Sequence, residues 1–381
     1  MATATAPSRT HRRAPASARP RPAHFLLLIA TVAVLNVVGI VMVLSASSVL
    51  SITTYGSAWY FFERQLIWTV LGALAFGVTM RIDYRRWREW TQPLLFVAAG
   101  MLVLVLVPHF GIYVAGSRRW LGIGSWRFQP TELAKLALVL FAAELLTRRE
   151  HEMHDWRATL RPVLAVVVVL GGLVFLEPDL DSAVLLGVIA AAMLLVAGAR
   201  VRHLASLSAL GVGACLILAL SAPYRRARLL TFLHPSAAAA NGGYQLVQSL
   251  IALGSGGVSG AGLGAGRAKW LFLPNAHTDF IFAVIGEELG LIGTLAVLGL
   301  FAAFAVLGIR AARRAPDRFG TLVAAGITVW VVAQAAVNIG GVVGLLPVSG
   351  VPLPFVSFGG SALVFTMLAT GILANVARQG R

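Results

Sequence analysis

The sequence predicts an all-α, polytopic integral membrane protein with about ten transmembrane helices. The chain is 58% hydrophobic and only 12% charged, whereas soluble domains are about 25% charged. Apolar runs of about 20 residues, long enough to cross the hydrocarbon core as a helix, recur along the whole chain. The net charge of +16 is spread over short basic clusters between these runs. This distribution indicates membrane topology and argues against nucleic-acid binding.

The apolar runs define one transmembrane domain over residues 24–377. Residues 1–23 are polar, rich in Pro and Ala, and basic, which predicts a disordered cytoplasmic tail, and 378–381 form a second, short cytoplasmic tail. The first run is too long for the apolar core of a signal peptide and is interpreted as a signal-anchor helix. The ten predicted spans are 24–48, 62–80, 93–108, 131–147, 162–177, 182–199, 203–222, 279–309, 319–343 and 359–377.

The linkers between the spans predict their orientation. One alternating set of linkers, together with both termini, holds 21 of the 31 basic residues and is therefore expected in the cytoplasm. The other set holds the long segments and is expected outside; these are 49–61, 109–130, 223–278 and 345–360. Both termini are then cytoplasmic, and the large loop 223–278 between spans seven and eight is extracytoplasmic.

Two features stand out in this large loop. Its stretch GYQLVQSLIALGSGG predicts an amphipathic helix lying in the membrane interface. The apolar side of that helix comprises Leu246, Val247, Leu250 and Ile251, and the polar side Gln245, Gln248 and Ser249. The glycine-rich run 254–266 lacks both a βαβ context and a Gly-Lys-Ser/Thr ending, so it is not a nucleotide-binding loop. We expect a flexible turn that lets the chain approach a neighbour closely.

Three carboxylates lie at or inside the eighth predicted span, where charge is unfavourable. Asp279 falls at its outer mouth, where a helix N-terminus favours an anion, so a capping role and a functional role are both open. Glu287 and Glu288 lie about 12 Å deeper. Residues at that depth normally face partners inside the bundle. Because adjacent residues point about 100° apart on a helix, we expect these two to contact different partners in a structural role.

Charged residues also gather before and inside the fourth span. Arg118 and Arg119 lie in an outer segment, against the positive-inside tendency, and can form a cationic cradle for phosphate. Glu132 and Lys135 follow at i,i+3, where they can neutralise each other or contribute to that cradle. The sequence leaves both interpretations open.

Three further residues are weaker candidates in the outer segments. Asp179, in the acidic turn LEPDLDS, can help to bind a cation or can be merely solvated. Lys269 adds outer basic charge. His277 lies two residues before Asp279 and can influence it, although a loop histidine usually has no such role.

Several long motifs occur in an order that resembles one known family. These are RRWLGIGSWRFQPTELAK, EPDLDSA, GLGAGRAKWLFLPNAHTDFIFAVIGEELGLIG and NIGGVVGLLPVSGVPLPFVSFGGSA. Together they resemble the SEDS family of bacterial shape, elongation, division and sporulation proteins, of the RodA, FtsW and SpoVE type, over nearly the whole chain after residue 24. The wording VIGEELGLIG and the long N-terminal tail are closer to FtsW than to RodA. The chain departs from the family at three places. The family usually has Gly-Thr where this chain has Asp181-Ser182, Glu where it has Asn275, and Tyr where it has Phe358.

The resemblance implies a peptidoglycan glycosyltransferase of the bacterial cytoplasmic (inner) membrane, with its active site facing outward. It implies lipid II, an undecaprenyl-diphosphate-linked disaccharide peptide, as substrate. It also implies a class B penicillin-binding protein and other divisome or elongasome proteins as partners. The family's essential loop aspartate corresponds to Asp279, and its fourth-span pair to Glu132 and Lys135. Ser357, in the last motif, joins the expected substrate-binding residues.

The expected chemistry needs one base and one way to stabilise a leaving diphosphate. A single carboxylate can accept the proton of a sugar hydroxyl, and Asp279 would be that base. Arg118, Arg119, Lys135 or a divalent cation, Mg²⁺ or Mn²⁺, would stabilise the diphosphate. Two rival functions are a lipid II flippase and a non-catalytic division scaffold. The first would need polar groups along a path to the cytoplasmic side.

Overall fold

The computed structural model describes residues 23–114, 117–124, 126–152, 156–221, 226, 232–233 and 243–380. The predicted N-terminal tail, except for Ala23, lies outside these residues, as does much of the large loop before residue 243. Ala23 already belongs to the first helix, and the last helix continues to Gln379, so Arg378 and Gln379 of the predicted C-terminal tail are helical.

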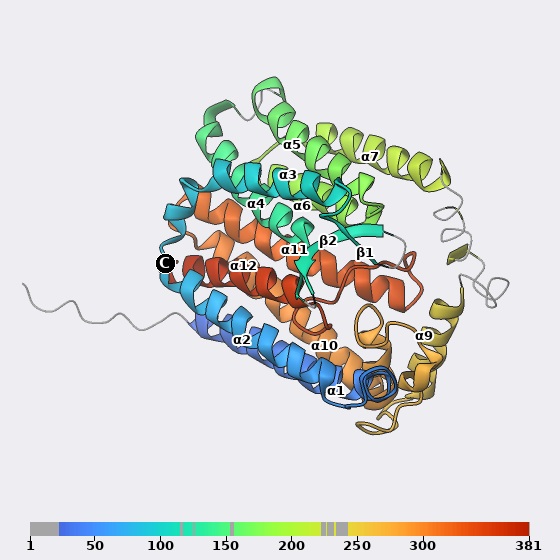
Figure 1. The fold of residues 1–381 in the computed structure, drawn as a ribbon. Helices are drawn as coiled ribbons and strands as arrows, with labels where there is room; N and C mark the ends of the chain where they lie inside the picture. The colour runs from blue at the N-terminus through green and yellow to red at the C-terminus, as the bar shows by residue number, and fades with distance from the viewer. Residues whose placement is uncertain are drawn as a thin grey trace, which may run out of the picture.

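Figure 1 shows a bundle of long helices, and each predicted span overlaps one of them. They are α1 (Ala23–Tyr55), α2 (Tyr60–Arg81), α3 (Thr91–Leu106), α4 (Pro130–Arg148), α5 (Trp156–Leu176), α6 (Leu180–Ala197), α7 (Val201–Ser221), α10 (Ile281–Arg313), α11 (Arg318–Val342) and α12 (Gly360–Gln379). Within the described residues, α1, α2, α6, α10, α11 and α12 are long and apolar enough to cross a membrane, and two shorter apolar helices accompany them. The fold is therefore that of a multi-pass membrane protein.

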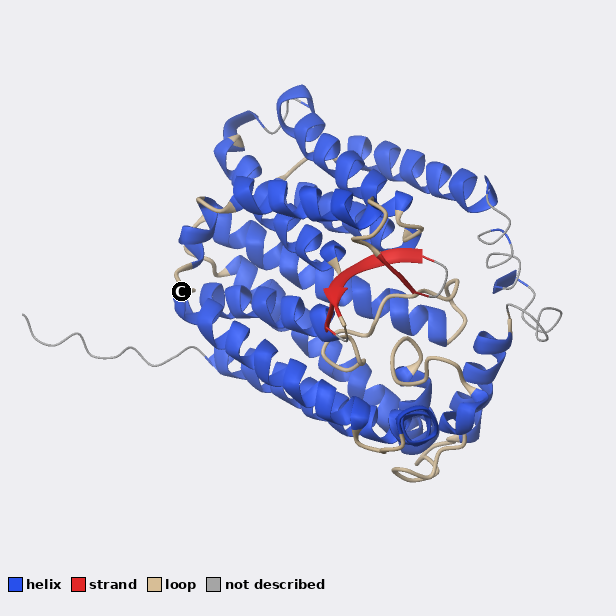
Figure 2. Cartoon of the chain, viewed as in Figure 1, coloured by secondary structure: helices blue, strands red, loops and turns tan. Residues whose placement is uncertain are grey.

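The prediction of an all-α chain is wrong in one outer segment, which contains a small sheet (Figure 2). Its antiparallel strands, in the order β1-β2-β3, are β1 (Ile112–Val114), β2 (Ser117–Ile123) and β3 (Trp126–Phe128). Gly124 adopts φ +61° in the turn between the last two strands. At Gly122 a Cβ atom would lie 2.0 Å from the carbonyl oxygen of Trp126, so only glycine fits there.

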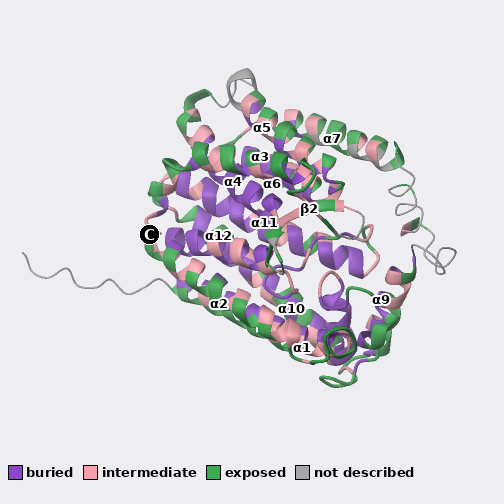
Figure 3. Cartoon of the chain, viewed as in Figure 1, coloured by how far each residue is buried: buried purple, intermediate pink, exposed green. Residues whose placement is uncertain are grey.

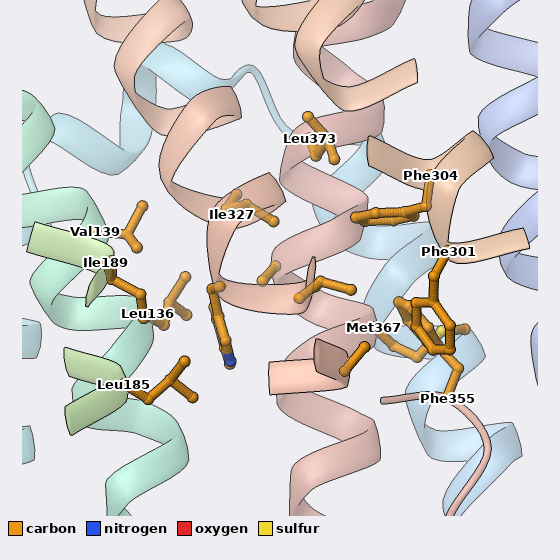
Figure 4. Packing of buried hydrophobic residues seen from close by; sticks show 14 of the residues in the cluster. Leu136, Val139, Leu185, Ile189, Phe301, Phe304, Ile327, Phe355, Met367 and Leu373 are labelled. Carbon is orange, nitrogen blue, oxygen red and sulfur yellow. The ribbon is translucent and has the colours of Figure 1, made fainter. Parts of the chain in front are cut away.

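Residues in the middle of the bundle are buried (Figure 3), and most of them are apolar. Figure 4 shows them interdigitating between neighbouring helices: Leu136 and Val139 come from α4, Ile327 from α11, and Phe301 and Phe304 from α10. The outer surface of the bundle is also apolar, as at Val37, Leu74 and Phe96. Helices that are apolar on all sides are expected where the surrounding solvent is lipid.

Polar contacts identify one end of the bundle. His24 Nε2, at the start of α1, lies 3.1 Å from the carbonyl oxygen of Ala377 near the end of α12. Its Nδ1 atom lies 3.4 Å from Arg314, at the end of α10. The Tyr84 hydroxyl, in the short helix η1 (Tyr84–Arg88), donates to Asp317 at 2.7 Å. The segments predicted to be cytoplasmic thus meet at one end, and Asp279 stands at the other.

The helix α10, which is as long as α1, is broken at a point that the sequence did not predict. Gly290 has φ +66° and ψ −161° inside α10. The glycine-rich segment 257–262 pairs with the free backbone groups of residues 287–292; for example, Ala261 N–H donates to the carbonyl oxygen of Glu287 at 2.9 Å. The expected close approach of this segment to a neighbour is confirmed, and the neighbour is α10.

The predicted amphipathic helix exists as α9 (Tyr244–Ser255), and one residue of its predicted polar side is buried against the protein. Leu246, Ser249 and Ala252 are buried, whereas Leu250 and Ile251 are exposed. The Ser249 hydroxyl, predicted on the polar side, donates to the carbonyl oxygen of Val342 at 2.9 Å. The serine is buried because it satisfies a carbonyl at the end of α11.

Candidate active site

Asp279 lies in the turn just before α10 and is half-buried. The helix α10 begins at Ile281, and Phe280 separates it from Asp279. Its main-chain carbonyl accepts a 2.8 Å hydrogen bond from the Asn338 amide of α11. The same amide donates to the carbonyl of Val351 at 2.9 Å. One side chain therefore fixes the backbone of Asp279 against the loop 345–359.

Ser357 holds the same turn from the other side. Its hydroxyl donates to the carbonyl oxygen of Thr278 at 2.6 Å and accepts from the Leu353 N–H at 2.9 Å. The neighbouring Phe358 N–H donates to the carbonyl of His277 at 3.0 Å. The structure thus brings the predicted residues Ser357, His277 and Asp279 together. Ser357 acts there as a brace, through both its donor and its acceptor capacity.

His277 is buried among aromatic rings beside Asp279. Its ring centroid is 4.5 Å from that of Phe61 on α2 and 5.7 Å from that of Phe358. Burial lowers the pKa of His277 from 6.5 to about 4, because a low-dielectric site disfavours the charged form. At neutral pH His277 is uncharged and cannot provide a positive charge for a diphosphate.

Glu132 and Lys135 form a buried ion pair in α4. The Lys135 ammonium is 2.8 Å from Glu132 Oε1 and donates to Gln334 Oε1 at 2.7 Å. It also lies 5.0 Å from the ring centroid of Trp330. Lys135 is fully buried, and the second oxygen of Glu132 is buried without a hydrogen-bond partner. These contacts join α4 to α11. They are consistent with the interpretation that Glu132 and Lys135 neutralise each other's charge.

Arg118 and Arg119 differ sharply although they are adjacent on β2. The side chain of Arg118 is exposed. Arg119 donates from Nε to the carbonyl of Glu177 at 3.2 Å, contacts the carbonyl of Pro178, and lies 3.7 Å from the Asp179 carboxylate. Arg119 therefore ties the sheet to the turn between α5 and α6, while Arg118 projects from it.

The carboxylates of the acidic turn are not available as ligands for a cation. Asp179 caps α6, accepting from Ser182 N–H at 3.2 Å and from the Ser182 hydroxyl at 2.8 Å. Asp181 accepts from the Gly350 N–H at 3.1 Å. Burial raises the pKa of Glu177 to about 9, with a contribution from nearby Asp179, so it is protonated at neutral pH. Within the described ranges no group of three or more His, Cys, Asp or Glu could hold a metal, and we derive no step through a cation.

Glu287 and Glu288 contact different partners, as their angular separation predicts. Glu287 accepts from the backbone N–H groups of Arg267 and Ala268, at 2.7 and 3.0 Å. Glu288 accepts from the Ser45 hydroxyl of α1 at 2.7 Å and pairs with Lys269 at 3.1 Å. Lys269 is thus a buried structural partner of Glu288, and its contacts are separate from those of Arg118 and Arg119.

Buried polar atoms without partners collect at the Asp279 end of the bundle. Among the described residues of that end they belong to Ser51, Gln65, Thr131, Glu132, Glu177, Asn338 and Ser349. Most buried polar groups in proteins are hydrogen-bonded, so a cluster of exceptions calls for an explanation. A region that receives a polar ligand or ordered water provides one.

Two residues that organise this site were not predicted from the sequence. Gln334 contacts Lys135, and Asn338 fixes Asp279. They are four residues apart on α11 and therefore share one helical face. Two amides at this spacing inside an apolar span were a signal that could have been used, because polar residues within membranes normally contact partners.

Comparisons with known proteins identify the family of the chain. Residues 25–381 match the family model described as cell cycle protein, FTSW_RODA_SPOVE. The chain is 40% identical to the probable peptidoglycan glycosyltransferase FtsW of Geobacter metallireducens, over 93% of this chain and 94% of that protein. It is 40% identical to stage V sporulation protein E of Bacillus subtilis, over 93% and 97%, and 44% identical to the probable FtsW of Mycobacterium tuberculosis, over 96% and 72%.

Two solved structures share the fold. A chain of a peptidoglycan synthase complex that coordinates polymerization and crosslinking superposes with a TM-score of 0.77, at 29% identity over 93% of this chain and 97% of that one. The rod shape determining protein RodA of Thermus thermophilus superposes with a TM-score of 0.69, at 27% identity over 93% and 96%. With the family model covering nearly all of the sequence, the chain belongs to the FtsW, RodA and SpoVE family of cell cycle proteins.

Proposed function

We propose that this protein is a peptidoglycan glycosyltransferase that polymerises lipid II at the outer face of the bacterial cytoplasmic membrane. The observation that carries the proposal is the braced position of Asp279. Its backbone is held by Asn338, and the neighbouring turn is held by Ser357. A carboxylate on a fixed backbone at the end of a membrane bundle suits a substrate whose sugar lies outside the membrane while its lipid remains inside. The names of its FtsW relatives, probable peptidoglycan glycosyltransferases, support the same reaction.

Asp279 acts in this proposal as the general base. It accepts the proton of the attacking sugar hydroxyl as the new glycosidic bond forms and the bond to the diphosphate breaks. The departing electron pair stays on the diphosphate, which needs charge stabilisation rather than protonation. A second carboxylic acid of the kind that glycosidases use is therefore unnecessary.

Arg118 is the best candidate among the predicted cations to contact the diphosphate. Its exposed side chain lies on the sheet at the Asp279 end of the bundle. Arg119 and Lys135 are already engaged, the first with the acidic turn and the second with Glu132 and Gln334. Both can still align the elements that surround the substrate.

A class B penicillin-binding protein is the proposed partner, with other division or elongation proteins around the pair. The similarity to a chain of a synthase complex that couples polymerization to crosslinking supports this assignment. A polymerase that releases uncrosslinked glycan outside the membrane also needs a transpeptidase close by.

The experiment that tests the proposal compares the parent protein with Asp279→Asn. Purified full-length protein, with and without the transpeptidase, is given lipid II, and glycan strands are separated by gel electrophoresis. The amide keeps the size but cannot act as a base, so polymerisation should fall about 10²–10⁴-fold, while lipid II binding and melting temperature are retained. Near-parent polymerisation by folded Asp279→Asn would contradict the base role and favour a structural role for Asp279 in the turn before α10. Absence of polymerisation by the folded parent protein, with and without the transpeptidase, would favour the scaffold alternative.

The transport alternative has less support. A flippase needs polar groups along a route through the bundle. Between α4, α6, α10, α11 and α12 apolar side chains occupy much of the described interior, including Leu136, Leu185, Ile189, Phe304 and Leu373 (Figure 4). The buried polar side chains Glu132, Lys135 and Gln334 in this region are bonded to one another. The single break in α10 is sealed by residues 257–262.

A further inference from the structure

Three consecutive apolar side chains project from the segment that precedes Asp279. Trp270, Leu271 and Phe272 are 61%, 57% and 55% exposed, and they lie in the single π-helical turn η3 (Ala268–Phe272). The residues on either side, Lys269 and Leu273, are buried. A charged residue inside and an apolar run outside is the reverse of the usual arrangement in water.

The surrounding contacts hold this run rigidly outward. Glu287 accepts hydrogen bonds from the backbone of Arg267 and Ala268, and Lys269 is paired with Glu288 at 3.1 Å. Leu271 has φ +68°, a left-handed conformation that is strained for a branched side chain. Strain of this kind persists only where neighbouring contacts over-determine the backbone.

The depth of the run follows from two contacts between α1 and α10. At one end of this antiparallel pair, His24 meets Arg314. At the other, the Ser45 hydroxyl donates to Glu288. Residues 24 and 45 are 21 positions apart in one helix, which corresponds to about 32 Å. The hydrocarbon core of a bilayer is about 30 Å thick, so Ser45 lies at its outer boundary.

The apolar run lies at that same boundary. The Lys269 ammonium donates to the Ser45 hydroxyl at 3.3 Å, and Trp270 follows directly. The exposed side of α10 just after its break is apolar as well, at Leu291, Ile292 and Leu295. The run is therefore level with the end of a lipid-facing surface, at a depth where tryptophan is enriched in membrane proteins.

We propose that Trp270, Leu271 and Phe272 form an interfacial anchor that inserts into the outer leaflet, between the headgroups and the acyl chains. The anchor follows from the membrane fold and does not depend on Asp279 being a base. Only residues 273–278 separate the anchor from Asp279. The anchor and Asp279 are therefore neighbours in the segment that leads into α10.

Depth-dependent fluorescence quenching tests the anchor. The full-length chain carries Cys215→Ser, since Cys215 is its only cysteine, and one new cysteine at Phe272, Leu298 or Ser57. Each variant is labelled with bimane and reconstituted in nanodiscs that contain lipids with a nitroxide either near the headgroup or deep in the acyl chain. Leu298 is exposed on α10 at a deeper level, and Ser57 is exposed beyond the outer end of α1.

The probe at Phe272 should be quenched at least about twofold more by the shallow nitroxide than by the deep one. The order should reverse at Leu298, and Ser57 should be quenched weakly by both. A Phe272 probe quenched no more than the Ser57 probe, or quenched most by the deep nitroxide, overturns the proposal. If Phe272→Cys fails to fold, Trp270→Cys replaces it and is held to the same criteria.

A second arm distinguishes lipid from a protein partner. The labelled protein is reconstituted with the class B penicillin-binding protein, and quenching by the shallow nitroxide is measured again. Unchanged quenching at Phe272 supports lipid contact in the assembled complex. Quenching that disappears on complex formation means that the run is a docking surface for protein, and it overturns the lipid assignment.

Discussion

At the scale of single residues, burial separates roles that the sequence left open. Lys135 could have paired with Glu132 or contacted the diphosphate. The fold surrounds it with Glu132, Gln334 and the ring of Trp330. Asp279, in contrast, is held by its backbone through Asn338. The residue type was readable from the sequence in both cases, but the partners come from α11 and depend on tertiary packing.

The Glu132–Lys135 pair provides a prediction about this difference. Lys135→Ala leaves a buried carboxylate without its cation, which typically costs about 3–5 kcal/mol, so folded yield and melting temperature should fall. Exchanging the two residues, Glu132→Lys with Lys135→Glu, restores a neutral pair and should recover most of the folded yield. Polymerisation per folded molecule should recover with it. A stable exchanged protein that remains as inactive as Lys135→Ala would instead indicate direct contact with the substrate.

Glu177 provides a pH-dependent prediction. Its folded-state pKa of about 9 lies above the ordinary value of 4.5. The folded state therefore retains a proton that the unfolded state loses, and the associated stability, complete below pH 4.5, is lost as the pH rises through about 9. Glutamine mimics the protonated acid at every pH. Glu177→Gln should therefore raise the melting temperature relative to the parent, with a difference that grows from pH 5 to pH 9 in differential scanning fluorimetry. A difference that is the same at both pH values would contradict the assignment.

At the scale of elements, the hydrophobic pattern predicted the helices well wherever an apolar run coincides with a helix. The predicted span 131–147 corresponds to α4 at Pro130–Arg148, and 319–343 to α11 at Arg318–Val342. The hydrophobic pattern did not predict where α1 ends or where α10 is broken. α1 continues to Tyr55 through a polar stretch, because a helix needs no apolar side chains once it leaves lipid. The break at Gly290 could not be predicted, because it depends on pairing with residues far away in the fold.

That break predicts unequal effects of two similar glycine substitutions. Gly260 and Gly262 both have positive φ, +81° and +101°. At Gly260 a Cβ would lie 2.2 Å from the carbonyl oxygen of Glu288, whereas at Gly262 its nearest neighbour would be 3.9 Å away. Gly262→Ala should cost only the conformational strain of about 1–2 kcal/mol. Gly260→Ala should add a backbone clash and lower the melting temperature and folded yield clearly further. If the two variants lose the same melting temperature and folded yield, backbone strain alone explains the loss and the close contact of Gly260 with α10 does not contribute to stability.

At the scale of the whole molecule, the chain has two chemically different ends. One end joins the start of α1, the linker after α2 and the start of α11, with Asp317 receiving bonds from Tyr84 and Arg85, each at 2.7 Å. The hydrogen bonds that Asp317 accepts from Gly320, Tyr84 and Arg85 lower its pKa despite partial burial. The other end holds Asp279, the small sheet and the buried polar atoms without partners. The alternation of basic linkers predicted this division, although the contacts within each end were not accessible from the sequence.

The division leads to a prediction of membrane topology. Ser57 lies in the turn between α1 and α2, at the Asp279 end, and Ala315 lies between α10 and α11, at the basic end. Because arginine-rich linkers are retained in the cytoplasm, a membrane-impermeant maleimide added to intact cells should label Ser57→Cys in a Cys215→Ser background. It should label Ala315→Cys only after permeabilisation. Labelling of both sites after permeabilisation controls for accessibility. The reverse pattern would put Asp279 on the cytoplasmic side, where a lipid II polymerase could not build wall, and would contradict the proposed function together with the orientation.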